Sequence, residues 1–209
     1  MKTKAVLSLV VGLLAGASFL PGCATQAERA RSTARSSATD FQRSLEGLPS
    51  RIENTLTSLN QVTAGNNTNR AASFREFSQA LQFQQDAATR LGRQADAAQA
   101  NSQEFFRQYI AQAMASRDPA ARQNAMDSLA GRQDAVNSAL RFLNDGRNQY
   151  REFAGTLRDL QNDLRVDLSQ ASIDRLTPRV QAAIRQGTDL RNYIDRLDEQ
   201  LNAVLNIAQ

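Results

Sequence analysis

The C-terminal segment has a regular spacing of apolar residues that restricts its fold more than any other feature. Steps of three and four residues meet only apolar or small residues, at Ile173, Leu176, Val180, Ala183, Gly187, Leu190, Ile194, Leu197, Leu201, Val204 and Ala208. A 3.5-residue repeat kept for about five heptads predicts a helix that packs in a seam against other helices. Ile184, Tyr193, Leu205 and Ile207 widen the apolar stripe. A two-stranded coiled coil needs only a narrow stripe, so the width favours a bundle of three or four helices.

The same spacing recurs in three earlier segments. It runs from Ala34 to Val62, from Phe74 to Tyr109, and from Pro119 to Leu168. The first contains Pro49, which removes a backbone donor and predicts either a kink or a break within residues 47–50. Because each long helix would contain about 45 residues, its length would be roughly 70 Å.

Polar turn residues separate these segments. Gly65-Asn66-Asn67-Thr68-Asn69 predicts a loop. Asp118 followed by Pro119 predicts an N-cap and the first residue of a helix. Ser172 is a suitable N-cap for the C-terminal helix, and so is Thr177 before Pro178; we expect the helix to start at Ser172, with Pro178 bending its first turns.

Together these patterns predict an all-α fold, an elongated up-and-down bundle of three to four long helices with coiled-coil-like packing over residues 38–209. The width of the stripe favours a self-sufficient monomer. A helical hairpin that dimerises would produce much the same pattern, so the oligomeric state stays open.

The N-terminus has the features of an export signal. Lys2 and Lys4 precede an uncharged, mostly apolar stretch from Ala5 to Phe19, which is too short for a comfortable membrane span. We therefore expect residues 1–22 to be a signal peptide.

The signal ends in Leu20-Pro21-Gly22-Cys23, which contains the chain's single cysteine. This sequence resembles the lipobox of bacterial lipoproteins, although Pro21 is unusual at its place. The resemblance implies that Cys23 becomes the N-terminus and carries diacylglycerol and an amide-linked acyl chain such as palmitate. Several acyl chains hold a protein firmly at a membrane. The alternatives are an uncleaved anchor and a secreted protein with a free thiol.

Residues 23–37 are rich in Ala, Arg, Ser and Thr and are expected to form a flexible tether or a weak helix. Position 24 is Ala rather than Asp. By resemblance to lipoproteins, this implies sorting to the outer membrane, with the bundle facing the periplasm.

The residues needed for most catalytic sites are missing. The sequence has no His, both lysines precede residue 5, and the one Cys is the expected lipid attachment site. These absences exclude an imidazole base, a lysine nucleophile and a thiolate metal site. We therefore predict no enzyme activity, no cofactor and no metal.

Arginine is the one enriched binding residue, but its pattern does not indicate a nucleic-acid partner. Without the two N-terminal lysines, the formal net charge of +4 falls to about +2. The arginines of residues 141–165 alternate with acidic residues, which is typical of a surface rich in salt bridges.

Three large apolar residues lie outside the predicted seam. Phe83 follows the seam residue Leu81 by two positions, and Phe106 and Ile110 are also displaced from the seam. They form either a patch that binds a partner or itself, or packed residues brought inward by drift of the seam along a long helix.

The chain as a whole resembles a family of bacterial envelope lipoproteins of unknown function that form helical coiled-coil bundles. The resemblance is strongest from Leu164-Arg165-Val166-Asp167-Leu168 to the Asp-Leu-Arg and Ile-Asp-Arg-Leu sequences of residues 189–197. It implies a fold and a location, but no active site.

Two functions fit these observations. The first is a lipid-anchored structural or adaptor rod that holds an envelope protein, associates with itself, or spaces the membrane from another envelope layer. The second is a periplasmic chaperone-like or regulatory module that binds clients through Phe83, Phe106 and Ile110.

Overall fold

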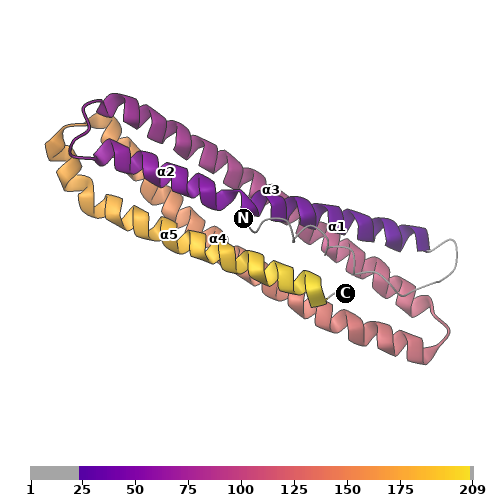
Figure 1. The fold of residues 1–209 in the computed structure, drawn as a ribbon. Helices are drawn as coiled ribbons and strands as arrows, with labels where there is room; N and C mark the ends of the chain where they lie inside the picture. Colours follow the sequence, from indigo (N-terminus) through magenta and orange to yellow (C-terminus); the bar gives the residue numbers. More distant parts are fainter. Residues whose placement is uncertain (1–23, 208–209) are drawn as a thin grey trace, which may run out of the picture. The chain divides into compact units, whose positions relative to one another are not determined.

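The computed structural model describes residues 24–207, and the fold is an all-α helical bundle (Figure 1). The helices are α1 (Ala24–Glu46), α2 (Leu48–Thr63), α3 (Arg70–Ala115), α4 (Pro119–Val166) and α5 (Gln170–Ile207). No strand occurs between residues 24 and 207. The all-α prediction is therefore confirmed.

The chain divides into two compact units. Of the described residues, the first contains 24–42, Arg93–Phe142 and 197–207, and the second contains Arg43–Gly92 and Leu143–Arg196. The first unit thus includes most of α1, and the second includes α2. Helices α3, α4 and α5 each contribute residues to both units.

The interruption near Pro49 falls between α1 and α2, within the second unit. Gly47 lies between the two helices with φ −82° and ψ −12°, which are right-handed helical values. Pro49 occupies the first turn of α2, where a missing backbone N–H costs least. The segment 24–37, for which the sequence left a tether or a weak helix open, belongs to α1.

Side-chain caps begin the later helices. The carboxylate of Asp118 accepts a hydrogen bond from the N–H of Ala120 at 2.9 Å, as the sequence predicted for α4. Asn69 caps α3 through its side-chain oxygen and the N–H of Ala72, at 3.2 Å. The loop of residues 64–69 lies where the Gly-Asn sequence indicated.

The prediction that Ser172 caps α5 was wrong. The helix begins at Gln170, and the Ser169 hydroxyl oxygen accepts a hydrogen bond from the N–H of Ser172 at 3.3 Å. Asp167 in turn accepts hydrogen bonds from the N–H and the hydroxyl of Ser169, which lower the pKa of its carboxyl group. These contacts place the N-cap three residues earlier than expected. Pro178 lies inside the helix.

The second unit has a dense core built from α2, α3, α4 and α5. Its fully buried apolar side chains come from all four helices: Ile52, Leu59, Val62, Phe77, Phe153, Leu157, Leu160, Leu164 and Ala183. Gly187 permits a close approach, because a Cβ there would lie 2.7 Å from Leu56 Cδ1 and 3.1 Å from the Phe153 ring. The C-terminal seam from Ile173 to Ile194 therefore faces a packed interior, as its spacing predicted.

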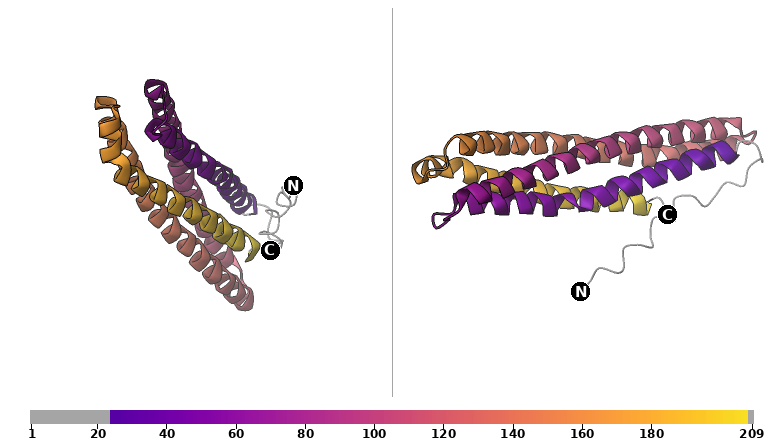
Figure 2. Two further views of the ribbon diagram at one scale, coloured as in Figure 1. Left: turned by 60° about the vertical axis from the view of Figure 1, so that its left-hand side comes forward. Right: turned by 90° about the horizontal axis from the view of Figure 1, so that it is seen from above.

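Ion pairs at the surface of the second unit join its helices. Arg179 of α5 pairs with Asp159, at 3.8 Å, and with Asp163, both in α4. Arg191 of α5 pairs with Glu53 of α2. The two views of Figure 2 agree that the second half of α4 and α5 lie side by side. Such exposed pairs set orientation more than they add stability.

The first unit has a thinner core among its described side chains. Phe41, Ala95, Phe106, Leu129 and Leu197 are its buried apolar residues. Phe105 contacts the rings of Phe106 and Tyr109, at centroid distances of 5.7 and 6.0 Å. Gln42 of α1 donates a hydrogen bond to Asp198 of α5 at 3.4 Å. Much of this unit's helix surface is half-buried or exposed.

Candidate functional site

Phe83 lies where the sequence predicted, on the outer surface of α3 in the second unit. Its side chain is 57% exposed, although Leu81 and Gln84 on the same turn are 1% and 0% exposed. The ring therefore faces outward from a well-packed helix, rather than from a frayed end. Its role in binding a partner stays a prediction.

Of the two alternatives for Phe106, a binding patch or packing through seam drift, the structure shows packing. Phe106 is 8% exposed in the first unit, and Ile110 is half-buried, whereas the expected seam residue Phe105 is only half-buried. An α-helix drifts by about 20° per heptad from a strict 3.5-residue repeat. Over the heptads from Leu81 to Phe106 this drift brings the neighbouring residue into the core. Only Phe83 of the three remains a strongly exposed apolar candidate.

Cys23, the expected lipid attachment site, lies outside the described residues. Helix α1 begins at Ala24, the next residue in the chain. In the part of the chain that the structure describes, no helix is sufficiently long and apolar to span a membrane.

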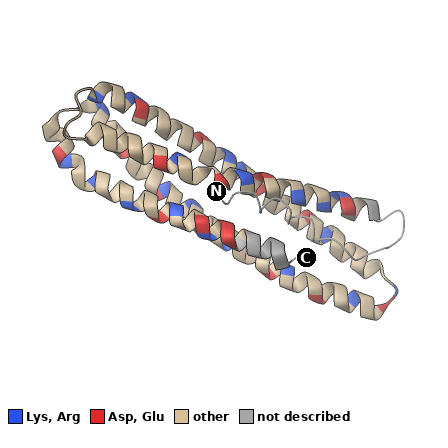
Figure 3. Cartoon of the chain, viewed as in Figure 1, with Lys and Arg blue, Asp and Glu red and all other residues tan. Residues whose placement is uncertain are grey.

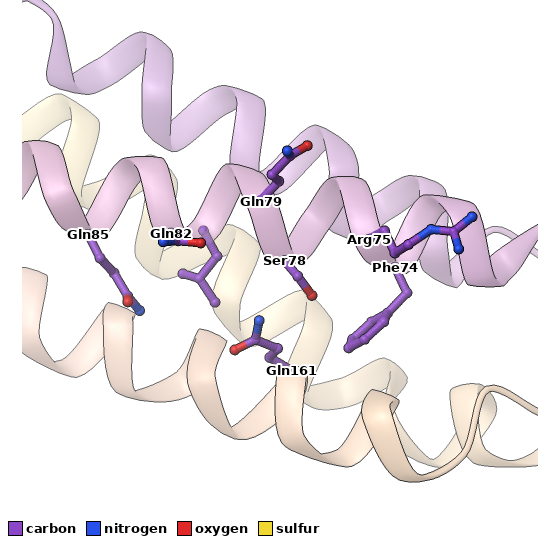
Figure 4. A pocket seen from close by; sticks show the side chains of 8 residues that line it. Phe74, Arg75, Ser78, Gln79, Gln82, Gln85 and Gln161 are labelled. Atoms are coloured by element: carbon purple, nitrogen blue, oxygen red, sulfur yellow. The ribbon is translucent and has the colours of Figure 1, made fainter.

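An open groove lies between α3 and α4 in the second unit (Figure 4), and the heptad spacing did not predict it. Its volume is about 790 Å³, and polar side chains form most of its lining: Phe74, Arg75, Ser78, Gln79, Leu81, Gln82, Gln85 and Gln161. Ser78 and Gln85 of α3 and Gln161 of α4 point toward the space between the two helices. The glutamine-rich sequence of residues 79–85 was the available signal.

A buried polar layer crosses the core of the same unit. Gln84 of α3 is 0% exposed, and neither atom of its side-chain amide has a hydrogen-bond partner. The hydroxyl of Tyr150 in α4 is also buried without a partner. Burial raises the pKa of Tyr150 to about 12. A polar contact with the Gln84 side chain, which lies outside hydrogen-bond geometry, offsets part of this effect.

Tyr150 gives the second unit a predicted sensitivity to alkaline pH. The unfolded phenol loses its proton near its ordinary pKa of 10.0, whereas the folded phenol keeps it to about pH 12. Stability is therefore unaffected below pH 10 and falls between pH 10 and 12, by about 2–3 kcal/mol in total. Urea unfolding of the parent and Tyr150→Phe at pH 9, 10, 11 and 12 measures this loss. An identical alkaline loss in both proteins would contradict the assignment.

The other shifted groups have local physical causes. Burial raises the pKa of Tyr193, and Asp145 adds to the shift, while burial lowers the pKa of Arg31. Between residues 24 and 207 no group of three or more Cys, Asp or Glu side chains is arranged to hold a metal ion. Basic and acidic residues alternate along the helices in the view of Figure 3.

Comparisons with known proteins give no match to this chain. No protein-family model, no curated protein and no solved structure is significantly similar to it.

Proposed function

We propose that this chain is a non-catalytic lipoprotein of the bacterial cell envelope, which acts as a structural or adaptor helical bundle. In this proposal Cys23 carries the lipid, the anchor lies in the outer membrane, and the bundle faces the periplasm. The lipobox-like sequence from Leu20 to Cys23 supports the anchor. Because α1 begins at Ala24, the folded protein would follow the anchor without a long linker.

The observation that carries the adaptor role is the exposure of Phe83. A phenylalanine ring that is 57% exposed on a rigid helix leaves apolar surface available to a partner. Aromatic anchors of this kind supply much of the binding energy of protein interfaces. The expected partner is an envelope protein or a second copy of this chain. Nucleic acid is not an expected partner, since the surface charges have mixed signs.

A chaperone-like role, the alternative, has less support. It requires several apolar side chains that grip clients together, but Phe106 is 8% exposed and Ile110 is half-buried. One exposed ring suits a specific contact better than a broad client surface.

Replacing Cys23 by alanine tests the anchor. We expect the parent protein to remain in the membrane fraction after a salt wash and to incorporate labelled palmitate. The Cys23→Ala variant should do neither, because it lacks the thiol that accepts diacylglycerol. A matched Ser36→Ala variant, altered at an exposed position of α1, should behave as the parent. Membrane retention and label in Cys23→Ala would exclude lipidation at this residue.

A further inference from the structure

The polar side chains that line the α3–α4 groove make no hydrogen bonds or ion pairs with the rest of the described protein. Arg75, Ser78, Gln79, Gln82, Gln85 and Gln161 have no side-chain hydrogen bond or ion pair to another described residue. The Ser78 hydroxyl is moreover buried. Some other glutamine amides are paired, as in Gln108 with Glu104 at 2.8 Å and Gln123 with Asp127 at 2.9 Å. The groove therefore gathers free donors and acceptors in one place.

The chemistry of this lining restricts the ligand. Each glutamine offers two donors and an acceptor, and the serine offers both functions. A phosphate only accepts hydrogen bonds, and a metal cation requires acidic ligands that the groove lacks. A matching ligand must carry many neutral groups that both donate and accept. Arg75 is the single charged residue of the lining, so it could pair with one acidic group of the ligand.

Size and shape restrict the ligand further. The volume of about 790 Å³ accommodates a ligand of several rings. The part of α3 that lines the groove extends from Phe74 to Gln85, which corresponds to roughly 17 Å along a helix. Phe74 points toward α4 in Figure 4 and adds an apolar surface. An open, long and hydrogen-bonding groove suits a linear ligand rather than a compact one.

The usual modes of peptide recognition do not fit this groove. They use a sheet edge, an apolar groove for an amphipathic helix, an aromatic-lined groove for a polyproline helix, or a cluster of arginines. The part of the chain that the structure describes has no strand, and this groove is lined by six polar residues, one of them an arginine, and by Phe74 and Leu81. A linear oligosaccharide instead offers hydroxyl groups on its edges and C–H faces that can pack on an aromatic ring.

We propose that the groove formed by Ser78, Gln82, Gln85 and Gln161 binds a linear oligosaccharide that carries hydroxyl and acetamide groups. Acetamide groups suit the site because each can both donate to and accept from a glutamine side chain. This activity goes beyond the adaptor role and does not depend on Cys23 or Phe83. The protein would then contact a polysaccharide with one surface and a protein partner with another.

Titration with tetra-N-acetylchitotetraose tests the proposal. The purified protein is labelled with ¹⁵N-glutamine, so that the side-chain NH₂ signals report directly on the groove. We expect saturable shifts for Gln82, Gln85 and Gln161, and none for Gln123, which pairs with Asp127 in the first unit.

Variants show whether the amides themselves bind. Gln85→Ala with Gln161→Ala should weaken binding at least about fourfold, because each lost neutral hydrogen bond corresponds to about two- to tenfold. Gln181→Ala, an exposed position of α5 in the same unit, should bind as the parent. Equal affinity of the double variant and the parent, or no saturable shift at millimolar sugar, would overturn the proposal. So would saturable binding of a glycine–glutamine tetrapeptide without binding of the sugar.

Discussion

Replacing Phe153 by alanine is expected to lower the free energy of unfolding of the second unit by about 3–5 kcal/mol. The ring is 0% exposed, and it lies against Gly187, whose missing side chain makes room for it. Removing it leaves a cavity that Gly187 cannot fill. Leu157 and Leu160 of the same helix are 0% exposed and already packed, so they can fill little of the space.

Urea unfolding followed by circular dichroism measures this loss. Phe153→Leu keeps most of the buried volume and should lose less than about 1.5 kcal/mol. Phe83→Ala is the matched control, because its ring is largely exposed, and its loss should stay near 0.5 kcal/mol. If Phe153→Ala and Phe83→Ala lost the same free energy, the core of α4 and α5 would be packed differently.

Replacing Gln84 by leucine together with Tyr150 by phenylalanine is expected to raise the free energy of unfolding by about 1–3 kcal/mol. A buried polar group without a partner costs about 1–3 kcal/mol, and replacing both members by apolar groups of similar shape removes that cost. The side-chain amide of Gln84 and the hydroxyl of Tyr150 contact each other, but neither makes a hydrogen bond of good geometry. The single variants should gain less, because each leaves one polar group in the layer.

The control for the double variant is Gln82→Leu, since Gln82 is an exposed neighbour on α3. Its effect on stability should be within about 0.5 kcal/mol. Loss of more than 1 kcal/mol in the double variant would mean that ordered water completes the hydrogen bonds of this layer.

The buried residues of the 3.5-residue repeat were predictable, because an apolar residue at each of these positions needs only to face the core. Ile173, Leu176, Val180, Leu190 and Leu197 are each at most 8% exposed, as the 3.5-residue repeat requires. The helix ends near Asn69 and Asp118 were predictable for a different reason, since Asn and Asp side chains cap the backbone locally.

Features that depend on exact helix rotation or on helix neighbours were not predictable. Phe105 and Phe106 are adjacent in sequence, and a small drift of the helix decides which of them is buried. Ser169 and Ser172 are both suitable caps, and only the start of α5 distinguishes them. The groove joins Gln161 to Ser78 and Gln85 of another helix, and a heptad pattern does not specify such lateral pairs.

The central claim is that a membrane-anchored bundle holds one protein partner at Phe83. The most direct measurement is photo-crosslinking in intact cells, with a photoreactive amino acid at position 83 and a control at position 185, an exposed site on α5. We expect one dominant adduct from position 83, its loss in the Cys23→Ala background, and no such adduct from position 185. The same adduct with and without Cys23, or many diffuse adducts from both positions, would contradict a membrane-tethered adaptor.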